Sequence, residues 1–267
     1  MIFDTHAHYE DEQFDRDREA LIASLPLHGI RRVVNVSSSL ESLEKTRNLT
    51  EQVDWFYGAY GLHPENLPEI FFPASLEEPP AETDLDSRIR SCCRLPKAVA
   101  VGEIGLDYYW EKDPVKKELQ RTWFRRQIGI AREERLPVII HSRDAAEDTL
   151  RIAKEEKLGE IGGVMHCYSY SVEMAREYLD MGLFLGIGGV VTFKNARKLK
   201  ETVAYAPLSR LVLETDCPYL APVPYRGKRN CSLYLPRVVQ AIAEIKGITA
   251  EEVQAETWEN ACRLYRI

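Results

Sequence analysis

The chain has 267 residues, of which 45% are hydrophobic and 29% are charged, and its formal net charge at pH 7 is −7. The length and hydrophobic content are ample for one large core. The longest uncharged stretch, from Gly182 to Phe193, is too short and too rich in glycine to span a bilayer. The negative charge opposes nonspecific capture of long duplex DNA, for which a basic surface is expected.

Short apolar segments rich in β-branched residues recur along the chain and predict eight strands. They cover residues 2–6, 32–36, 55–60, 98–103, 137–141, 163–166, 183–187 and 211–216. Amphipathic segments of helical length lie between them. Asp113 before Pro114 marks one helix start, and Thr249 and Glu252 have the spacing of a capping box. This alternation predicts an α/β fold, a (β/α)8 TIM barrel, as a single domain over residues 1–267.

Potential metal ligands stand at the ends of these predicted strands: His6, His8, Glu103, His141, His166 and Asp216. In a (β/α)8 barrel, functional groups come from the C-terminal ends of the strands. His6 and His8 are two residues apart, so an extended chain points both side chains to one face. Four imidazoles and two carboxylates suit Zn, Mn, Fe, Co or Ni better than Ca. The predicted strand ends therefore indicate one metal site.

Six ligands are too many for one catalytic ion that keeps an open position, but they suffice for two ions that share a carboxylate. We therefore expect two divalent metal ions, drawn from Zn, Mn, Mg, Co and Ni. Glu103 is the expected shared ligand, because its strand is central in the strand order. His6, His8 and Asp216 are expected on one ion, and His141 and His166 on the other.

The motifs around these positions resemble those of the TatD family of metal-dependent hydrolases, often described as TatD-related DNases. They include Asp4-Thr5-His6-Ala7-His8, Gly61-Leu62-His63-Pro64, Gly102-Glu103-Ile104-Gly105-Leu106-Asp107, Ile140-His141-Ser142-Arg143, His166-Cys167-Tyr168-Ser169, Thr192-Phe193-Lys194-Asn195, Leu213-Glu214-Thr215-Asp216-Cys217-Pro218 and Arg226-Gly227-Lys228-Arg229-Asn230. The resemblance covers essentially the whole chain in the family's order. It implies the same six metal ligands and the hydrolysis of phosphodiester bonds, typically in DNA.

Two loops depart from the family pattern. Cys231-Ser232 stands where the family often continues Glu-Pro, and Tyr170 stands where a Gly is usual. Both lie near the expected substrate entrance, so they bear on substrate preference rather than on metal binding.

The expected reaction is in-line attack on phosphorus by a hydroxide shared between two ions. Asp216 is the expected proton acceptor and Glu103 the expected bridge. Cationic or hydrogen-bonding groups that follow predicted strand ends are expected to contact the phosphate, namely His63, Arg143, Lys194, Arg226 and Arg229. Arg226 and Arg229 suit the forked contact, and Lys194 suits a point charge. The arginines and Lys194 could equally be solvated surface charges, His63 could shape a loop, and Asp107 could be a turn residue.

Three classes of function remain open at this point. The first is a metal-dependent phosphodiesterase or deoxyribonuclease, resembling a 3′–5′ exonuclease, that acts on single-stranded DNA ends or small phosphodiesters. The second is an amide or ester hydrolase, for example of aminoacyl esters. The third is a barrel that binds metal and a partner without turnover, and six intact ligands argue against it. No obligate protein partner is evident.

The cysteines bear on the cellular compartment. Six are present without a C-x-x-C pair, and the adjacent Cys92 and Cys93 would make an awkward disulfide. We expect buried free thiols, which a reducing cytoplasm favours, and no targeting segment is visible at the N-terminus. His28 with Gly29 is expected to end a helix. Residues 71–96 are expected to form an acidic loop and a short helix that carries Leu85 and Ile89.

Overall fold

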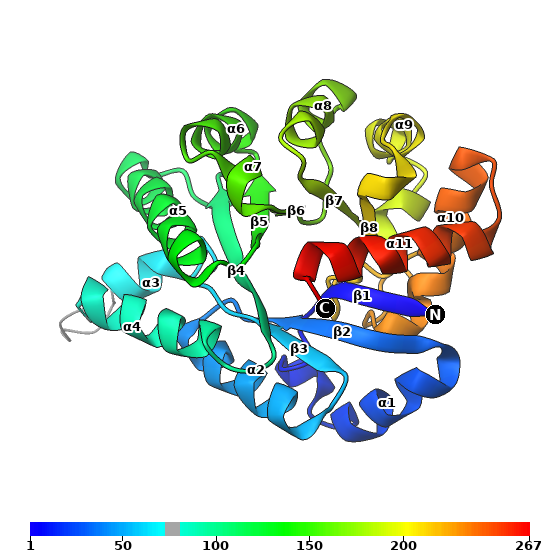
Figure 1. Ribbon diagram of the computed structural model, residues 1–267, viewed down its shortest axis with the longest axis horizontal. Helices are drawn as coiled ribbons and strands as arrows, with labels where there is room; N and C mark the ends of the chain where they lie inside the picture. Colours follow the sequence, from blue (N-terminus) through cyan, green and yellow to red (C-terminus); the bar gives the residue numbers. More distant parts are fainter. Residues whose placement is uncertain (73–80) are drawn as a thin grey trace.

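The barrel is built from parallel strands that follow one another in chain order, from β1 to β8, with helices around them (Figure 1). The computed structural model describes residues 1–72 and 81–267. This architecture confirms the predicted (β/α)8 barrel. The strands are β1 (Ile2–Ala7), β2 (Ile30–Val36), β3 (Phe56–Ala59), β4 (Ala98–Asp107), β5 (Val138–Arg143), β6 (Gly163–Met165), β7 (Phe184–Ile187) and β8 (Leu211–Leu213).

All eight predicted strands are present, but several ends differ from the prediction. β4 runs past Glu103 to Asp107, and β5 runs past His141 to Arg143. β6 and β8 instead stop before His166 and Asp216. The backbone φ is 46° at Cys167 and 56° at Asp216, so the chain leaves the extended conformation at these points. Residues that follow β6 and β8 therefore belong to loops above the barrel.

The barrel closes between β1 and the segment that follows β8. Ala7 forms a parallel bridge with Cys217. The carbonyl of His6 accepts hydrogen bonds from the backbone N–H of Thr215 at 3.3 Å and of Asp216 at 3.0 Å, and the N–H of His8 donates to Cys217 at 2.8 Å. This seam joins β1 to the segment after β8 and sets His6 and His8 beside Asp216.

Helix starts predicted from capping residues are confirmed. The Asp113 carboxylate accepts from the N–H of Val115 at 2.8 Å, and Thr249 and Glu252 form a capping box. The helices are α1 (Arg18–Ser24), α2 (Leu40–Gln52), α3 (Leu67–Phe71), α4 (Glu82–Cys93), α5 (Pro114–Glu134), α6 (Ala146–Glu155), α7 (Leu158–Ile161), α8 (Val172–Asp180), α9 (Arg197–Tyr205), α10 (Leu235–Lys246) and α11 (Ala250–Tyr265). Short 3₁₀ helices are η1 (Glu12–Phe14), η2 (Leu25–His28), η3 (Gly189–Thr192), η4 (Leu208–Arg210) and η5 (Ser232–Tyr234).

The barrel interior is a packed apolar core. It receives at least one buried side chain from each of the eight strands, namely Phe3, Val34, Val36, Ala59, Val99, Ala100, Ile139, Val164, Phe184 and Val212. Helix α11 adds Ala261, Leu264 and Tyr265 to the same cluster, and the Tyr265 hydroxyl donates to the carbonyl of Thr5 at 2.8 Å. Because the interior is filled, polar chemistry is confined to the C-terminal ends of the strands.

Other sequence expectations have mixed outcomes. The six cysteines are free, and four of them are buried while Cys167 and Cys262 are partly exposed. Leu85 and Ile89 are buried on α4, as expected, whereas the part of the acidic loop at residues 73–80 lies outside the described residues. Gly29 ends η2 at φ 83°, and His28 Nδ1 lies 3.0 Å from the Ser24 carbonyl, as expected for a helix end.

Within residues 1–72 and 81–267, no helix is long and apolar enough to cross a membrane.

Candidate metal centre

The six predicted ligands meet at the C-terminal ends of the strands. His6 lies on β1, with His8 just beyond its end, Glu103 lies on β4 and His141 on β5. His166 and Asp216 follow β6 and β8. His6, His8, Glu103 and His166 are buried, and the ring of His6 stacks on that of His166 at a centroid distance of 3.5 Å. The expected convergence of these six residues is therefore present in the fold.

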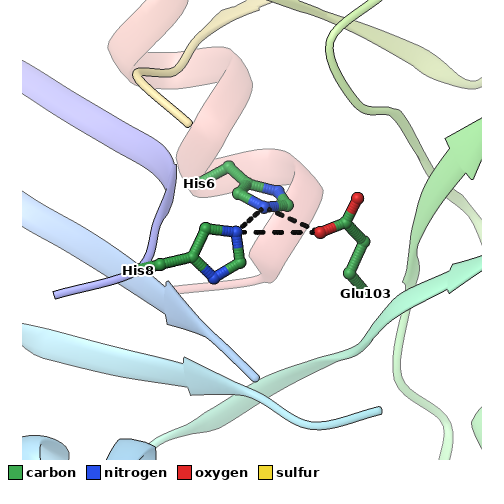
Figure 2. A group of neighbouring side chains, drawn as sticks. All are labelled: His6, His8 and Glu103. Carbon is green, nitrogen blue, oxygen red and sulfur yellow. Dashed lines mark hydrogen bonds and ion pairs between the residues drawn. The ribbon is translucent and has the colours of Figure 1, made fainter. Parts of the chain in front are cut away.

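One group of donor atoms surrounds a point between β1 and Glu103. Figure 2 shows the rings of His6 and His8 facing the Glu103 carboxylate. The two Nε2 atoms are 3.0 Å apart, and they lie 3.3 Å and 3.7 Å from Glu103 Oε2. Asp216 Oδ1 is 3.8 Å from His6 Nε2 and 3.5 Å from His8 Nε2. Four donor atoms thus define a first position, as expected for His6, His8 and Asp216 with Glu103.

These separations fit a bound divalent ion. Ligand atoms about 2.0–2.2 Å from a tetrahedral zinc ion lie about 3.3–3.6 Å from one another. The N–N and N–O separations of 3.0–3.8 Å span that interval. Mixed imidazole and carboxylate donors also suit the divalent transition metals. The donor atoms of these residues therefore fit the divalent ion that the sequence implied.

Hydrogen bonds fix two of the rings in the orientation that a metal requires. His8 Nδ1 lies 2.7 Å from the carbonyl of Val36, which can only accept, so Nδ1 carries the proton. His166 Nδ1 lies 3.1 Å from Glu214 Oε2. When neutral, both rings therefore turn an unprotonated Nε2 toward Glu103 and Asp216. His6 Nδ1 is buried and has no hydrogen-bond partner among the described residues.

A second group of donors faces the other oxygen of Glu103. Oε1 lies 2.8 Å from His141 Nδ1, 3.6 Å from His63 Nε2 and 3.7 Å from His166 Nε2. His166 Nε2 also lies 3.5 Å from Asp216 Oδ1, so this ring stands between the two groups. His63 was expected as a phosphate contact, and the structure places it beside the predicted ligands instead. Glu103 therefore presents one oxygen to each group, as a bridging carboxylate would.

Both carboxylates of the cluster are held in their ionised form. Burial alone would raise the pKa of Glu103, but the neighbouring imidazoles of His166, His63 and His6 outweigh it and hold that pKa well below its usual range. Burial likewise opposes ionisation of Asp216, and the imidazoles, His166 foremost, again lower its pKa. The cluster is therefore suited to a cation at neutral pH.

Two histidines of the second group, His63 and His141, differ in protonation. Burial lowers the pKa of His63 to about 3, with a further contribution from His141. Burial also acts against the charged form of His141, but hydrogen bonds to Asp107 and Glu103 raise its pKa to about 9. The Asp107 carboxylate reaches His141 Nε2 at 3.0 Å. Asp107 is thus a partner of the cluster as well as a turn residue.

The remaining predicted substrate contacts have different surroundings. Arg143, Lys194 and Arg226 are exposed and make no ion pair with the described residues, and the Arg226 guanidinium lies 3.9 Å from the ring centroid of Phe193. Arg229 differs from the expectation. Its two terminal nitrogens reach Asp17 at 2.7 Å and 2.6 Å, and one of them also donates to Gln13. These contacts engage the fork that was expected to bind a phosphate.

Two buried carboxylates without a predicted role, Glu214 and Asp4, form hydrogen bonds with residues at or next to the predicted ligands. Glu214 contacts His166 and also accepts from the N–H of Cys167 at 2.6 Å. Asp4 accepts from the hydroxyls of Thr215 at 2.7 Å and Ser232 at 2.6 Å. Burial raises the pKa of Asp4 to about 7. Asp4 and Glu214 each stand two residues before a predicted ligand, and that spacing is the sequence signal that could have found them.

Comparisons with known proteins identify the family. A family model described as TatD related DNase matches residues 3–266. The metal-dependent hydrolase YabD of Bacillus subtilis is 44% identical over 267 residues, which is 100% of both chains. The metal-dependent hydrolase YcfH of Escherichia coli is 36% identical over 270 residues, which cover 100% of this chain and 96% of YcfH.

Solved structures share the fold. The crystal structure of YjjV, a TatD homologue from Escherichia coli, matches with a TM-score of 0.89 at 28% identity over 100% of this chain and 98% of YjjV. A mutant organophosphorus hydrolase from Deinococcus radiodurans matches with a TM-score of 0.63 at 16% identity over 99% of this chain and 92% of that chain, which shows the fold alone. The chain therefore belongs to the TatD-related DNase family of metal-dependent hydrolases.

Proposed function

We propose that this protein is a phosphodiesterase that uses two divalent ions and cleaves DNA at single-stranded ends. The observation that carries the proposal is the position of Glu103, whose two oxygens face two separate groups of imidazole nitrogens. A carboxylate shared in this way suits a pair of ions that hold both the attacking and the leaving oxygen of an in-line displacement. The family description as DNases supports the choice of substrate.

The predicted ligands form two sets, one for each ion. His6, His8 and Asp216, together with Glu103, would hold the first ion, and His141 and His166, also with Glu103, would hold the second. Ions bound there supply an activated water and neutralise charge on the phosphoryl oxygens. Glu214 and the Val36 carbonyl keep their imidazole partners correctly oriented.

Asp216 is our candidate for the proton acceptor. Its side chain is 18% exposed, compared with 5% for Glu103, so an incoming water reaches it more readily. Its lowered pKa keeps it ionised, so the carboxylate can accept a hydrogen bond from that water and orient it. Arg143, Lys194 and Arg226 then supply the positive charge that the phosphates of DNA need.

The net charge of −7 restricts the substrate. A chain of this charge repels a long duplex from most of its surface, and positive charge at the strand ends acts on a short segment only. A single-stranded end or a small phosphodiester fits these conditions. A reducing cytoplasm is our proposed location, because the six cysteines are unpaired.

Hydrolysis after metal exchange tests the proposal. The protein is stripped of metal, reloaded with Mg, Mn, Co or Zn, and assayed on short single-stranded DNA and on a simple phosphodiester, with His6→Ala as the control variant. We expect cleavage that depends on the added ion and is lost in His6→Ala. Absence of cleavage by protein shown to contain metal would contradict the proposal, and hydrolysis of aminoacyl esters or amides under the same conditions would favour the alternative chemistry.

A further inference from the structure

Two exposed aromatic residues stand beside the metal centre. Tyr109 and Trp110 follow the end of β4 and are 44% and 64% exposed. Large apolar side chains are normally withdrawn from water, and a pair of rings exposed in succession indicates a contact surface. Their rings meet edge to face with centroids 4.7 Å apart. The proposed chemistry of the metal centre gives these rings no role.

One carboxylate joins this aromatic pair to the centre. Asp107 Oδ1 accepts from the backbone N–H of Tyr109 at 2.9 Å and of Trp110 at 3.0 Å. Asp107 Oδ2 lies 3.0 Å from Nε2 of His141, which contacts Glu103 through its other nitrogen. The backbone that carries the two rings is therefore fixed relative to the reacting position.

A cation completes the surface. The Arg143 guanidinium lies 3.9 Å from the ring centroid of Tyr109 and 5.6 Å from that of Trp110. Arg143 follows His141 by two residues on β5, so both side chains leave the strand on the same side. Arg143 makes no ion pair with the described residues, whereas Arg125 and Arg126 on α5 are each paired with two carboxylates. Its N–H donors are therefore open to an anion.

We propose that Tyr109, Trp110 and Arg143 form an aromatic platform that stacks one unpaired nucleobase next to the scissile bond, with Arg143 on the adjoining phosphate. The proposal rests on the phosphodiesterase function and defines its substrate as single-stranded nucleic acid. Stacking on an aromatic face needs a base that is free of its pairing partner, and a neighbouring guanidinium strengthens both contacts. A duplex end would have to fray before it could be bound.

Binding of matched oligonucleotides tests the platform without relying on turnover. The probes are a single-stranded hexathymidylate with phosphorothioate linkages, which resist cleavage, and an abasic strand of the same length and linkage. Their affinities for the metal-loaded protein are measured by fluorescence anisotropy. We expect Trp110→Ala to weaken binding of hexathymidylate about 5- to 100-fold and to leave binding of the abasic strand unchanged. Trp110→Phe should keep most of the affinity, because it keeps a ring.

Tyr205→Ala is the matched control. Tyr205 is 46% exposed, and the Arg176 guanidinium lies 5.6 Å from its ring centroid. It is the last residue of α9 and precedes the start of β8, whereas the metal centre lies at the C-terminal ends of the strands. This variant should bind both strands like the unsubstituted protein. In a turnover assay on ordinary single-stranded DNA, Trp110→Ala should raise KM and leave kcat nearly unchanged.

The outcomes separate the platform from the function beneath it. Equal losses for both strands, or no loss for either, would overturn the platform even if DNA is cleaved. Tighter binding of hexathymidylate than of the abasic strand, by a protein that hydrolyses no phosphodiester, would support the platform and overturn the proposed phosphodiesterase function. Failure to bind either strand would overturn both proposals.

Discussion

His166 depends on a buried partner for its orientation. Glu214 Oε2 lies 3.1 Å from His166 Nδ1, and the other oxygen of Glu214 accepts from the N–H of Cys167. A carboxylate in this position fixes the imidazole tautomer and increases its basicity as a metal ligand. Glu214 therefore acts through His166 rather than on the substrate.

Glu214→Gln should weaken divalent metal affinity or activity about 10- to 100-fold, because the amide keeps the shape but loses the charge. Metal affinity is measured by calorimetric titration of the stripped protein. Glu173→Gln on α8 makes the same change at an exposed carboxylate and should leave metal affinity unchanged. Unaltered affinity in Glu214→Gln would mean that Glu214 serves packing alone.

The positions of the predicted ligands could be read from the sequence, because each follows an apolar run and because side chains alternate along a strand. His6 and His8 are the clearest case. The surroundings of Arg229 could not be read in this way, since its ion pair with Asp17 depends on how η1 packs against a distant loop. His63 was assigned to the substrate because nothing in the sequence places the loop after β3 against Glu103.

Strand β7 has a glycine where the buried carboxylate needs space. A Cβ on Gly186 would lie 2.2 Å from Glu214 Oε2, a separation that no pair of such atoms tolerates. Glu214 is itself buried, so it has little room to move away. The absence of a side chain at Gly186 therefore makes the contact between Glu214 and His166 possible.

Gly186→Ala should weaken metal affinity, since it displaces Glu214, and should lower the free energy of unfolding by about 1–3 kcal/mol through overpacking. Gly129→Ala is the matched control, because a Cβ there meets no heavy atom within 4 Å. It lies within α5 and should instead raise the free energy of unfolding by about 0.5–1 kcal/mol. Urea denaturation and metal titration of both variants give the comparison. Metal affinity in Gly186→Ala equal to that of the unsubstituted protein would refute the role of this space.

At the level of the whole molecule, the closure of the barrel makes the site. The strand order follows from strand and helix alternation, which the sequence displays openly. The seam does not, because its backbone hydrogen bonds join His6 and His8 to residues 215–217, which are distant in the sequence. The ends of β6 and β8 also differ from the prediction, because the strands stop at Met165 and Leu213 and the backbone then takes positive φ angles at Cys167 and Asp216. The sequence pattern therefore predicts which residues gather at the strand ends, whereas the individual contacts between them depend on the closed barrel.

The proposed function depends most on Glu103 as a ligand shared by two ions. The most direct measurement is the metal-to-protein ratio of Glu103→Ala beside the unsubstituted protein, taken together with phosphodiester hydrolysis by the same samples. We predict two ions for each unsubstituted chain, and a variant that loses both bound metal and turnover. A Glu103→Ala protein that retains two ions and remains active would contradict the role of Glu103 as a shared ligand.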